Sequence, residues 1–504
     1  MSHHAFREPG DPLELEVDWI VVGSGAGGAS AAVALARGGA RVAVVEAGAW
    51  RDPEHYPSSA YGGARDLMPA FGGLATAGRA QWPVVQGEAV GGTTVINSAI
   101  CVRTPGDVFV RWAAEHGVGG GPMAERIGAI QDALEVELHA SRATGRAVGR
   151  SDVLALRGAA ALGYDSHPTR RFVEDCAGSG QCLQGCRAGR KQSLNLNFIP
   201  ETLERGGVVL SCAPVARIVL EGNRAAGVRG RFRHPRTRRA GASFQVRARH
   251  GVFVAASAIQ SPLLLRRSGI RNRSLGRQFH AHPGTGLFGW YDDPVDMHIG
   301  ATQGWSSLAH RDTGGFKLES LSIPLELVAG RLKGGGAVLA ERLEDFRHLA
   351  MWVMAVKAES VGSIHPGPLG PLVRYTLDRA DMVKMRTAAV LLAQTHFAAG
   401  ARWVIPGIHG LPYKIDADAL HTIEDAPLDP RAWVAVLSHL FGGCPMGADP
   451  ARSVCDGEGR VHGHQGLWIA DASQIPTNLG VNPQHTIMAL ARLRAETALS
   501  RATP

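Results

Sequence analysis

A chain of 504 residues is too long for one minimal domain and predicts two or three lobes. Its composition, 45% hydrophobic and 19% charged residues, is that of an ordinary globular protein and excludes disorder along the whole chain. No window holds about 18 uninterrupted apolar residues, so no membrane span is expected.

The net charge of +8 is compatible with an anionic partner, but the arginines are scattered. Only residues 233–239, RHPRTRR, form a dense basic run, which is typical of a solvated hairpin tip. Because no stacking aromatics or recognition motif accompany it, no nucleic-acid partner is predicted. The N-terminal segment lacks the pattern of a secretion signal, and seven cysteines, an odd number, argue against a secreted disulfide scaffold. The expected location is therefore the cytoplasm.

The first clear pattern is a complete strand–helix–strand unit in residues 18–46, with strands at 18–22 and 41–45 around a small-residue helix at 29–37. Gly23 permits the tight turn after the first strand, and Gly25 lets the backbone approach a pyrophosphate at the helix N-terminus. Gly28 lets the helix and strand pack closely. Glu46, at the end of the second strand, is placed to accept hydrogen bonds from an adenosine ribose, which disfavours NADP. FAD and NAD both fit this unit.

A second glycine-rich segment, residues 87–97 (GEAVGGTTVIN), distinguishes the two cofactors. Its residues Gly87, Gly91, Gly92 and Asn97 resemble the segment that follows the FAD pyrophosphate in the glucose–methanol–choline (GMC) oxidoreductases, flavoproteins that oxidise alcohols. Residues 257–270 and 275–283 resemble the family's second signature and the loop after it, although Arg271 stands where glycine is usual. The resemblance implies FAD as the cofactor. Covalent attachment is not expected, because some relatives link FAD through a histidine just before this asparagine and the chain has Ile96 there.

Three cysteines follow in a glycine-rich loop, with the spacing C-x₅-C-x₃-C: Cys176, Cys182 and Cys186. Such thiols can ligate an iron–sulfur cluster, and the spacing resembles that of bacterial sugar dehydrogenases of this family that hold a three-iron cluster. The segment 187–193 instead resembles alcohol-oxidising relatives without an established cluster. A cluster-free loop over the active-site entrance, with reduced thiols or one disulfide, is the interpretation that we prefer.

The order of these motifs predicts an α/β fold, a Rossmann-like FAD-binding domain with an inserted α+β substrate-binding domain, as in the architecture of p-hydroxybenzoate hydroxylase. We expect residues 1–286, with a cysteine-containing loop near 170–195, to form the N-terminal part of the FAD-binding domain. Residues 287–435 should form the substrate-binding domain, and residues 436–504 should return to the FAD-binding domain with the catalytic residues. Val215 resembles the family valine that contacts adenine through its backbone.

The C-terminal part carries the expected catalytic pair. His439 lies in SHLFGGCPMG, which resembles the family's HxxGTCxMG motif with Gly443 in place of threonine, and Asn482 follows 43 residues later. In the family, these two positions face the flavin N5 edge. An imidazole can take the hydroxyl proton near neutral pH, and an amide can position the same oxygen. The resemblance also implies that Asp471 and Gln484 bind FAD.

Other histidines are weaker candidates. His485, three residues after Asn482, is an alternative partner for the base or a packing residue at the start of a helix. His280 and His282 are interpreted as structural.

The expected reaction is oxidation of an alcohol to an aldehyde or ketone, with hydride transfer to the flavin. The alternatives are a flavin-containing lyase or isomerase on the same fold, a sugar dehydrogenase with an iron–sulfur relay, and a non-catalytic flavin-binding protein. The electron acceptor is O₂, a quinone or a redox partner. The substrate lobe contains aromatic residues that suit aromatic, terpenoid or long-chain alcohols, or a stacked sugar: Trp290, Tyr291, Trp305, Phe316 and Trp352.

Overall fold

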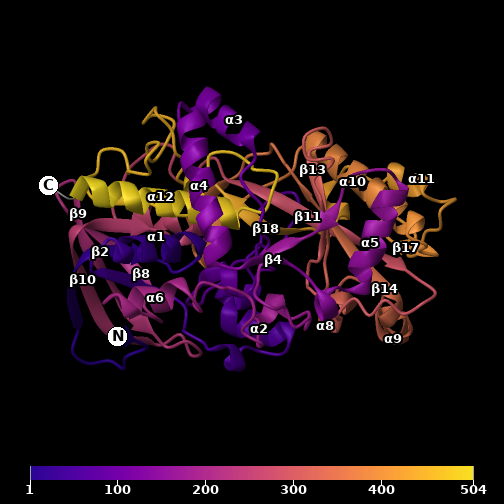
Figure 1. Cartoon of the computed structure of the whole chain (residues 1–504), viewed down its shortest axis with the longest axis horizontal. Coiled ribbons are helices and arrows are strands. Elements are labelled where there is room, and N and C mark those ends of the chain that lie inside the picture. The colour runs from indigo at the N-terminus through magenta and orange to yellow at the C-terminus, as the bar shows by residue number, and fades with distance from the viewer. Residues whose placement is uncertain (1, 503–504) are drawn as a thin grey trace.

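The computed structural model describes residues 2–502, which form two lobes along the long axis of the molecule (Figure 1). The left lobe in that view contains the first strands and the last helix, so both ends of the chain lie in it. The right lobe is built mainly from the middle of the chain. The expected α/β class with an inserted α+β part is therefore confirmed.

An eight-stranded sheet forms the centre of the first lobe, in the order β1-β7-β3-β2-β10-β9-β8, with β19 paired to β10. All its strand pairs are parallel except β10 with β9 and β9 with β8. The strands are β1 (Ser2–His4), β2 (Leu13–Val22), β3 (Val42–Val45), β7 (Val208–Leu210), β8 (Val215–Glu221), β9 (Arg224–Arg233), β10 (Ala240–Val254) and β19 (Leu467–Ile469).

A seven-stranded antiparallel sheet forms the centre of the second lobe, in the order β17-β11-β14-β13-β12-β5, with β18 paired to β11. Its strands are β5 (His167–Pro168), β11 (His280–Trp290), β12 (Trp305–Ser307), β13 (Phe316–Ser320), β14 (Leu349–Val356), β17 (Trp403–Ile405) and β18 (Val436–Phe441). Two small antiparallel pairs complete the strands: β4 (Ala140–Arg142) with β6 (Arg170–Phe172), and β15 (Ser363–Gly367) with β16 (Gly370–Arg374).

The helices cover the two sheets. In the first lobe, α1 packs on β2 and β3 and is covered in turn by α6 and α12, while α5 and α10 pack against β13 and β14 in the second. The helices are α1 (Ala26–Arg37), α2 (Ala60–Leu67), α3 (Gly106–His116), α4 (Gly121–Glu137), α5 (Arg150–Ala161), α6 (Phe198–Glu204), α7 (Ser257–Arg267), α8 (Leu325–Ala329), α9 (Gly336–Glu344), α10 (Arg379–Ala398), α11 (His421–Glu424) and α12 (Gln484–Ala502). Among the described residues, none of the helices combines the length and hydrophobicity that a bilayer crossing requires.

The first strand–helix–strand unit forms as expected, because its sequence suits a buried parallel sheet. In β2 the alternation of LELEV gives way to the fully buried run WIVV, where β3 and β10 flank the strand on both sides. A Cβ on Gly28 would lie 1.9 Å from the Gly23 carbonyl oxygen, so only glycine allows α1 to pack this closely on the turn.

The joint between the lobes differs from the expected boundaries. β11 starts at His280, so the boundary expected after residue 286 falls inside a strand. β18 belongs to the second sheet, although residues 436–504 were expected in the first lobe. α5 and β5 also join the second lobe from within residues 1–286. The lobe to which each of these elements belongs is set by strand pairing between segments that are distant in sequence. The order of motifs along the chain does not reveal that pairing.

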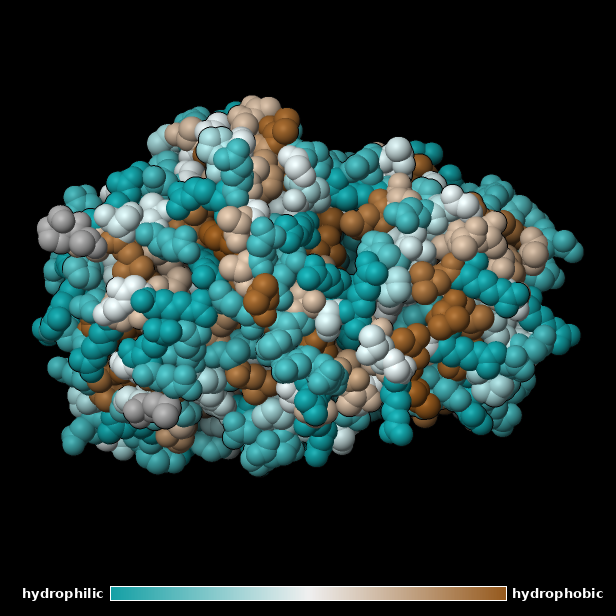
Figure 2. Space-filling model, in the orientation of Figure 1, coloured by the Kyte–Doolittle hydropathy of each residue, from teal (hydrophilic) through white to brown (hydrophobic). Residues whose placement is uncertain are grey.

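The basic run at residues 233–239 lies at the tip of the β9–β10 hairpin, as predicted. Two of its arginines, Arg233 and Arg238, form ion pairs with Glu88, and Arg239 forms one with Glu8. The chain itself therefore neutralises part of this run. The face in Figure 2 is hydrophilic over most of its area, with hydrophobic residues in small groups on both lobes.

The core of the second lobe contains a titratable side chain. His396 on α10 is fully buried and stacks on Trp352, with 3.7 Å between the ring centroids. Its Nδ1 lies 3.0 Å from the Tyr291 hydroxyl. Burial lowers the pKa of His396 to about 3, so the ring stays neutral in the folded protein at pH values where an unfolded chain protonates it.

We therefore expect His396 to make the protein less stable in mild acid. Between the two pKa values only the unfolded state binds this proton. The group therefore does not lower the free energy of unfolding above about pH 6.5, and it lowers that free energy progressively as the pH falls below this value. Lowering the pH from about 7.5 to about 5.5 should cost about 1.4 kcal/mol from this group. Urea unfolding at both pH values measures the free energy of unfolding of the wild type and of His396→Leu. The decrease between the two pH values should be smaller by that amount in the variant, and equal decreases in the two proteins would contradict the prediction.

Candidate functional site

The carboxyl ends of several parallel strands meet at one edge of the first sheet, where ligands of α/β proteins bind. Gly23 follows β2, Glu46 follows β3, and Asp471 lies two residues after β19. α1 begins at the same edge, and a helix N-terminus favours a negatively charged group. The structure thus brings together three residues that were predicted to bind the cofactor from distant parts of the chain.

The carboxylate of Glu46 ties the glycine turn to the end of β3. Its Oε2 accepts hydrogen bonds from the Ser24 N–H at 2.9 Å and the Ser24 hydroxyl at 2.8 Å, and its Oε1 accepts one from the Gly48 N–H at 2.8 Å. Burial raises the pKa of Glu46, and these hydrogen bonds oppose that effect. Because a carboxylate has about four acceptor positions, one is left for a ribose hydroxyl.

The second glycine segment lies against the first. The Gly91 N–H donates to the Ser24 hydroxyl at 3.0 Å, and a Cβ on Gly92 would lie 2.6 Å from the Gly25 Cα. Gly91 has a φ of +96°, which favours glycine. The two glycine segments, which we call the glycine cradle, therefore lie in direct backbone contact at the N-terminus of α1, a position that favours a negatively charged group such as a diphosphate.

Asp471 and the remaining predicted cofactor residues occupy four separate places in the structure. Asp471 is buried and accepts hydrogen bonds from the Ser257 N–H, at the start of α7, and from the Ser473 N–H, both at 2.8 Å. Asn97 donates from Nδ2 to Gln484 Oε1 at 2.6 Å, which joins the second glycine segment to the start of α12. Gly87 lies beside Gly92, and Val215 begins β8.

The expected catalytic pair is brought together from β18 and the loop before α12. Asn482 Nδ2 and His439 Nε2 lie 3.5 Å apart. Lys317 donates from Nζ to Asn482 Oδ1 at 2.5 Å, so the amide directs its NH₂ end towards His439. Burial lowers the pKa of His439 well below its ordinary value, and the charge of Lys317 and the neighbouring His282 lower it further. The ring is therefore neutral and able to accept a proton.

Gly443, the departure from the family motif, has a structural explanation. Its φ is +95°, and a Cβ there would lie 2.9 Å from the Ala258 carbonyl oxygen. The threonine that relatives carry would be strained in this backbone.

Lys317 and Glu319 on β13 form a buried ion pair that no sequence motif predicted, in which Nζ donates to Oε1 at 2.6 Å. Glu319 Oε2 also accepts a hydrogen bond from Gln303 at 3.2 Å. Burial lowers the pKa of Lys317, and the charge of Glu319 opposes this. In the segment FKLES the two charged residues alternate with Phe, Leu and Ser. This alternation is the sequence pattern that could have indicated a strand with its charged side chains on one face.

The structure also changes the interpretation of the other histidines. His282, expected to be structural, lies beside the expected base, with 3.1 Å between its Nδ1 and that of His439. His280 is buried, and no hydrogen-bond partner of its Nδ1 lies within residues 2–502. His485 contacts Cys101 Sγ at 3.7 Å and the Gln131 carbonyl oxygen at 3.2 Å, so it packs under α4 and is not the partner of His439.

Four of the five aromatic residues expected to form the substrate surface are instead packed in the core, and the fifth, Trp290, is only partly buried. Trp352 points from β14 towards His396 on α10, and the following group is buried in the core: Tyr291, Trp305, Phe316 and Trp352. Because side chains alternate along a strand, the opposite face of the sheet carries Lys317 and Glu319 towards Asn482. This face is mixed, because the strand register also places Val353, Phe288 and Trp290 on it.

The cysteine loop encloses a small hollow of about 10 Å³. Cys176, Cys182 and Cys186 all line it, and so do Arg171 and Lys191. Arg171 is 1% exposed and leaves Nε and Nη1 without a hydrogen-bond partner among residues 2–502. All seven cysteines are free, so the disulfide alternative is not found in the described chain.

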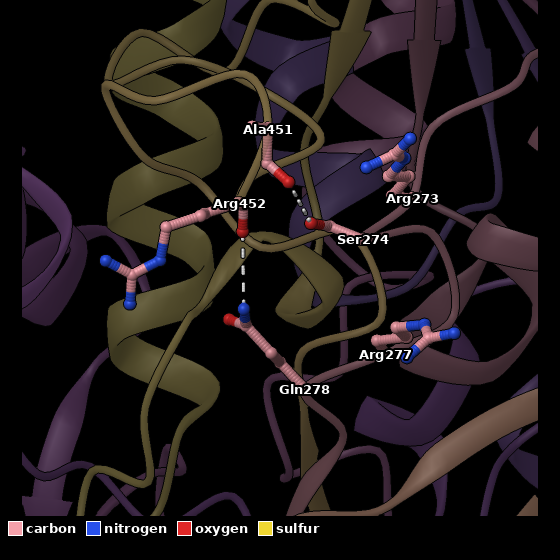
Figure 3. A pocket seen from close by; sticks show the side chains of 6 residues that line it. All are labelled: Arg273, Ser274, Arg277, Gln278, Ala451 and Arg452. Atoms are coloured by element: carbon pink, nitrogen blue, oxygen red, sulfur yellow. Dashed lines mark hydrogen bonds between the residues drawn. The ribbon is translucent and has the colours of Figure 1, made fainter.

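A second hollow, of about 520 Å³, lies away from these residues (Figure 3). Three of its lining side chains are arginines, Arg273, Arg277 and Arg452, and Figure 3 shows Arg452 directed away from the other two. None of the predicted site residues lines it.

Comparison with known proteins identifies the family. The model described as GMC oxidoreductase matches residues 19–284, and its C-terminal counterpart matches residues 359–491. An uncharacterised GMC-type oxidoreductase of Sinorhizobium fredii is 34% identical, over 97% of this chain and 96% of its own length. Long-chain-alcohol oxidase FAO3 of Arabidopsis thaliana is 24% identical, over 95% of this chain and 67% of its own.

Solved structures agree on the fold. Pyridoxine 4-oxidase from Mesorbium loti has a TM-score of 0.70 at 18% identity, over 95% of this chain and 98% of its own. Formate oxidase from Aspergillus oryzae has a TM-score of 0.72 at 15% identity, over 97% of this chain and 99% of its own.

The chain is thus a flavin-dependent enzyme of the oxidoreductase class. It belongs to the GMC oxidoreductases, and its cofactor is FAD, which the glycine cradle, Glu46 and the N-terminus of α1 fit.

Proposed function

We propose that this enzyme oxidises the CH–OH group of an alcohol to an aldehyde or ketone, with His439 as general base. The observation that carries the proposal is the pair of opposed nitrogens at 3.5 Å, His439 Nε2 and Asn482 Nδ2. The first can accept a proton and the second can donate a hydrogen bond, so one hydroxyl oxygen can interact with both. The relatives named long-chain-alcohol oxidases support the same class of substrate.

The residues of the chain divide the reaction as follows. His439 takes the hydroxyl proton at Nε2, which makes the oxygen more negative and weakens the neighbouring C–H bond. Asn482 Nδ2 donates to that oxygen and stabilises its developing charge, and Lys317 holds the amide in this orientation. When bound, FAD supplies the acceptor for the hydride. Asn482 is buried and His439 is partly buried, which limits the access of water to the reacting atoms.

Anaerobic mixing of the yellow protein with a panel of alcohols, sugars and sterols tests the proposal. A substrate alcohol should bleach the oxidised flavin spectrum and give one equivalent of carbonyl product. A lyase or isomerase would convert its substrate without bleaching. If no member of the panel bleaches the flavin while one is converted, the alternative replaces our proposal.

FAD retention should depend on Glu46. We expect the purified protein to release FAD on denaturation, because no covalent link is predicted at Ile96. Glu46→Ala should weaken FAD binding by roughly tenfold to a hundredfold, since hydrogen bonds to a charged acceptor contribute about 1.5–3 kcal/mol. Equilibrium dialysis of the apoprotein against FAD measures this. A Kd within about twofold of the wild type would show that the ribose is held elsewhere.

A second candidate, a dehydrogenase with an iron–sulfur relay, is favoured by one observation. The three cysteines line one hollow with a buried guanidinium that has two unpartnered nitrogens, and a cationic neighbour suits thiolates or an anionic cluster. A cluster there would supply one-electron transfer to a partner. We prefer the cluster-free loop, because the segment 187–193 resembles alcohol-oxidising relatives without an established cluster and the hollow beside the cysteines is small, about 10 Å³.

The anaerobically purified enzyme should accordingly contain no stoichiometric iron or acid-labile sulfide. Iron and sulfide assays with electron paramagnetic resonance measure this, and Cys182→Ser is the matched variant. Stoichiometric iron in the wild type that disappears in Cys182→Ser would establish the cluster, and little reaction with O₂ would then be expected.

A further inference from the structure

A chain of buried hydrogen bonds reaches His439 from the side opposite Asn482. His282 on β11 stands opposite His439 on β18 in the strand register. The two rings are nearly perpendicular, at 86°, and their Nδ1 atoms are 3.1 Å apart. His282 is 1% exposed. One of these two nitrogens must donate and the other must accept, so the pair has two alternative proton arrangements.

Asn478 decides between the two arrangements. Its Nδ2 donates to the Ala281 carbonyl oxygen at 2.8 Å and to the Ala358 carbonyl oxygen at 3.1 Å, so its Oδ1 is directed to the other side. That oxygen contacts Nε2 of His282 and also accepts the Gly480 N–H at 2.9 Å. The Gly480 N–H also lies 3.0 Å from His282 Nε2, but Asn478 Oδ1 accepts this N–H as well. Because an amide oxygen can only accept, the contact between Asn478 Oδ1 and His282 Nε2 requires a hydrogen on Nε2.

The remaining protons follow from this assignment. A neutral imidazole has one N–H, so His282 Nδ1 is an acceptor. His439 Nδ1 must then donate to it, which leaves the lone pair of His439 on Nε2, the atom that faces Asn482. The charged groups near His282 are Lys317, Arg311 and Lys357, all cationic, and with burial they lower the pKa of His282 to about 3. Both rings are therefore neutral.

We propose that His282 is a positioning residue that holds His439 in the tautomer with its proton on Nδ1 and its basic lone pair on Nε2, and that Asn478 sets the direction of this chain. The inference rests on the proposed function, because it concerns the same base. In many enzymes a carboxylate orients the catalytic histidine. Here the neutral amide of Asn478 is sufficient, because it only has to present an oxygen to His282.

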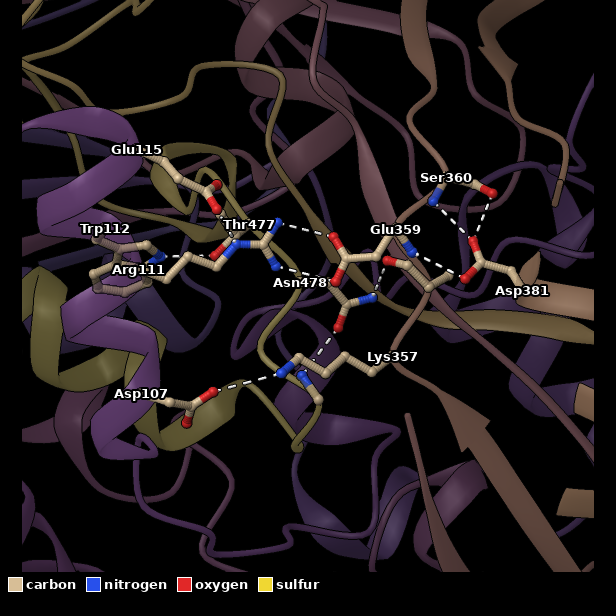
Figure 4. Close-up of polar contacts among 12 residues, drawn as sticks. Asp107, Arg111, Trp112, Glu115, Lys357, Glu359, Ser360, Asp381, Thr477 and Asn478 are labelled. Atoms are coloured by element: carbon tan, nitrogen blue, oxygen red, sulfur yellow. Dashed lines mark hydrogen bonds and ion pairs between the residues drawn. The ribbon is translucent and has the colours of Figure 1, made fainter. Parts of the chain in front are cut away.

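The position of Asn478 is itself fixed from both lobes (Figure 4). Its neighbour Thr477 accepts a hydrogen bond from Trp112 Nε1 on α3 at 2.8 Å. On the other side, the segment after β14 is held to α3 by an ion pair between Arg111 and Glu359 at 2.9 Å. The oxygen that selects the tautomer is therefore held at the junction of the lobes.

Two substitutions at His282 distinguish its proposed positioning role from a purely structural one. His282→Gln keeps a side-chain oxygen that can accept from His439 Nδ1, whereas His282→Leu keeps a buried side chain without an acceptor. His280→Gln, on the same strand, is the matched control. We expect the limiting rate of anaerobic flavin reduction to fall by roughly tenfold to a hundredfold in His282→Leu, with substrate Kd unchanged, as when a buried donor loses its acceptor. His282→Gln should stay within about threefold of the wild type, as should His280→Gln.

A second readout needs no substrate. In protein labelled with ¹⁵N-histidine, long-range ¹H–¹⁵N spectra show which ring nitrogen carries hydrogen, and His439→Ala identifies the signals. We expect His439 to be protonated at Nδ1 in the wild type and in His282→Gln, and mixed or reversed in His282→Leu. A wild-type ring protonated at Nε2, or equal losses in the Leu and Gln variants, would overturn the inference. If no alcohol bleaches the wild-type flavin, the proposed function fails, but the spectra still decide the tautomer.

Discussion

His439→Ala should reduce alcohol-driven flavin reduction by roughly a hundredfold to ten-thousandfold, the range typical of a lost general base. His439 is the only base in contact with Asn482 Nδ2 among the described residues, and its pKa is lowered by burial, so it is neutral and ready to accept a proton at physiological pH. Without the imidazole, the hydroxyl proton loses the acceptor that lies beside Asn482. Stopped-flow spectroscopy under anaerobic conditions measures the limiting reduction rate.

The variant should keep its FAD, because the cofactor cradle lies around Gly25 and Gly92 and does not use His439. The visible spectrum and the FAD content therefore serve as the control for folding. Added imidazole should restore part of the rate, because it can act as the missing base. A reduction rate near that of the wild type, in a variant with full FAD content, would refute the role of His439.

Asn482→Ala should lower the limiting reduction rate by roughly a hundredfold to a thousandfold, as for the loss of one preorganised donor to a developing oxyanion. The change also leaves Lys317 Nζ without one of its two acceptors, since this amine donates to Asn482 Oδ1 and Glu319 Oε1. The loss should appear in the reduction rate more than in substrate Kd, because the hydrogen bond strengthens as negative charge develops.

Asn482→Asp provides the comparison. It keeps an oxygen acceptor for Lys317 but replaces the NH₂ end that faces His439, so it should lose activity as Asn482→Ala does. Recovery of the wild-type rate in Asn482→Asp would show that Asn482 acts through Lys317 and not through its own donor.

Several features could be predicted from local sequence because each is specified over a short stretch. The strand, glycine turn and helix of residues 18–37 form as expected, since Gly23 and Gly28 occupy positions that a larger side chain would block. Resemblance to the family motifs paired His439 with Asn482, and the structure places His439 Nε2 and Asn482 Nδ2 3.5 Å apart. A short motif predicts such features because a glycine required by a tight turn, or an acidic residue at the end of a strand, interacts with residues close to it in the fold unit.

The environment of the base was decided by tertiary structure. His282 lies beside His439 because β11 and β18 pair antiparallel, although the two histidines are 157 residues apart in sequence. The same pairing is the reason that the boundary between the lobes differs from the expected one. Lys317 reaches Asn482 from β13, and Asn478 reaches His282 from a loop held by both lobes. These contacts depend on strand register, where a shift of one residue would turn Lys317 and Glu319 to the opposite face. The sequence by itself determined the cofactor unit, because that unit depends on neighbouring residues, and its resemblance to the family motifs supplied the proposed base. Only the tertiary structure decided which side chains orient that base, because long-range pairing has no local signature.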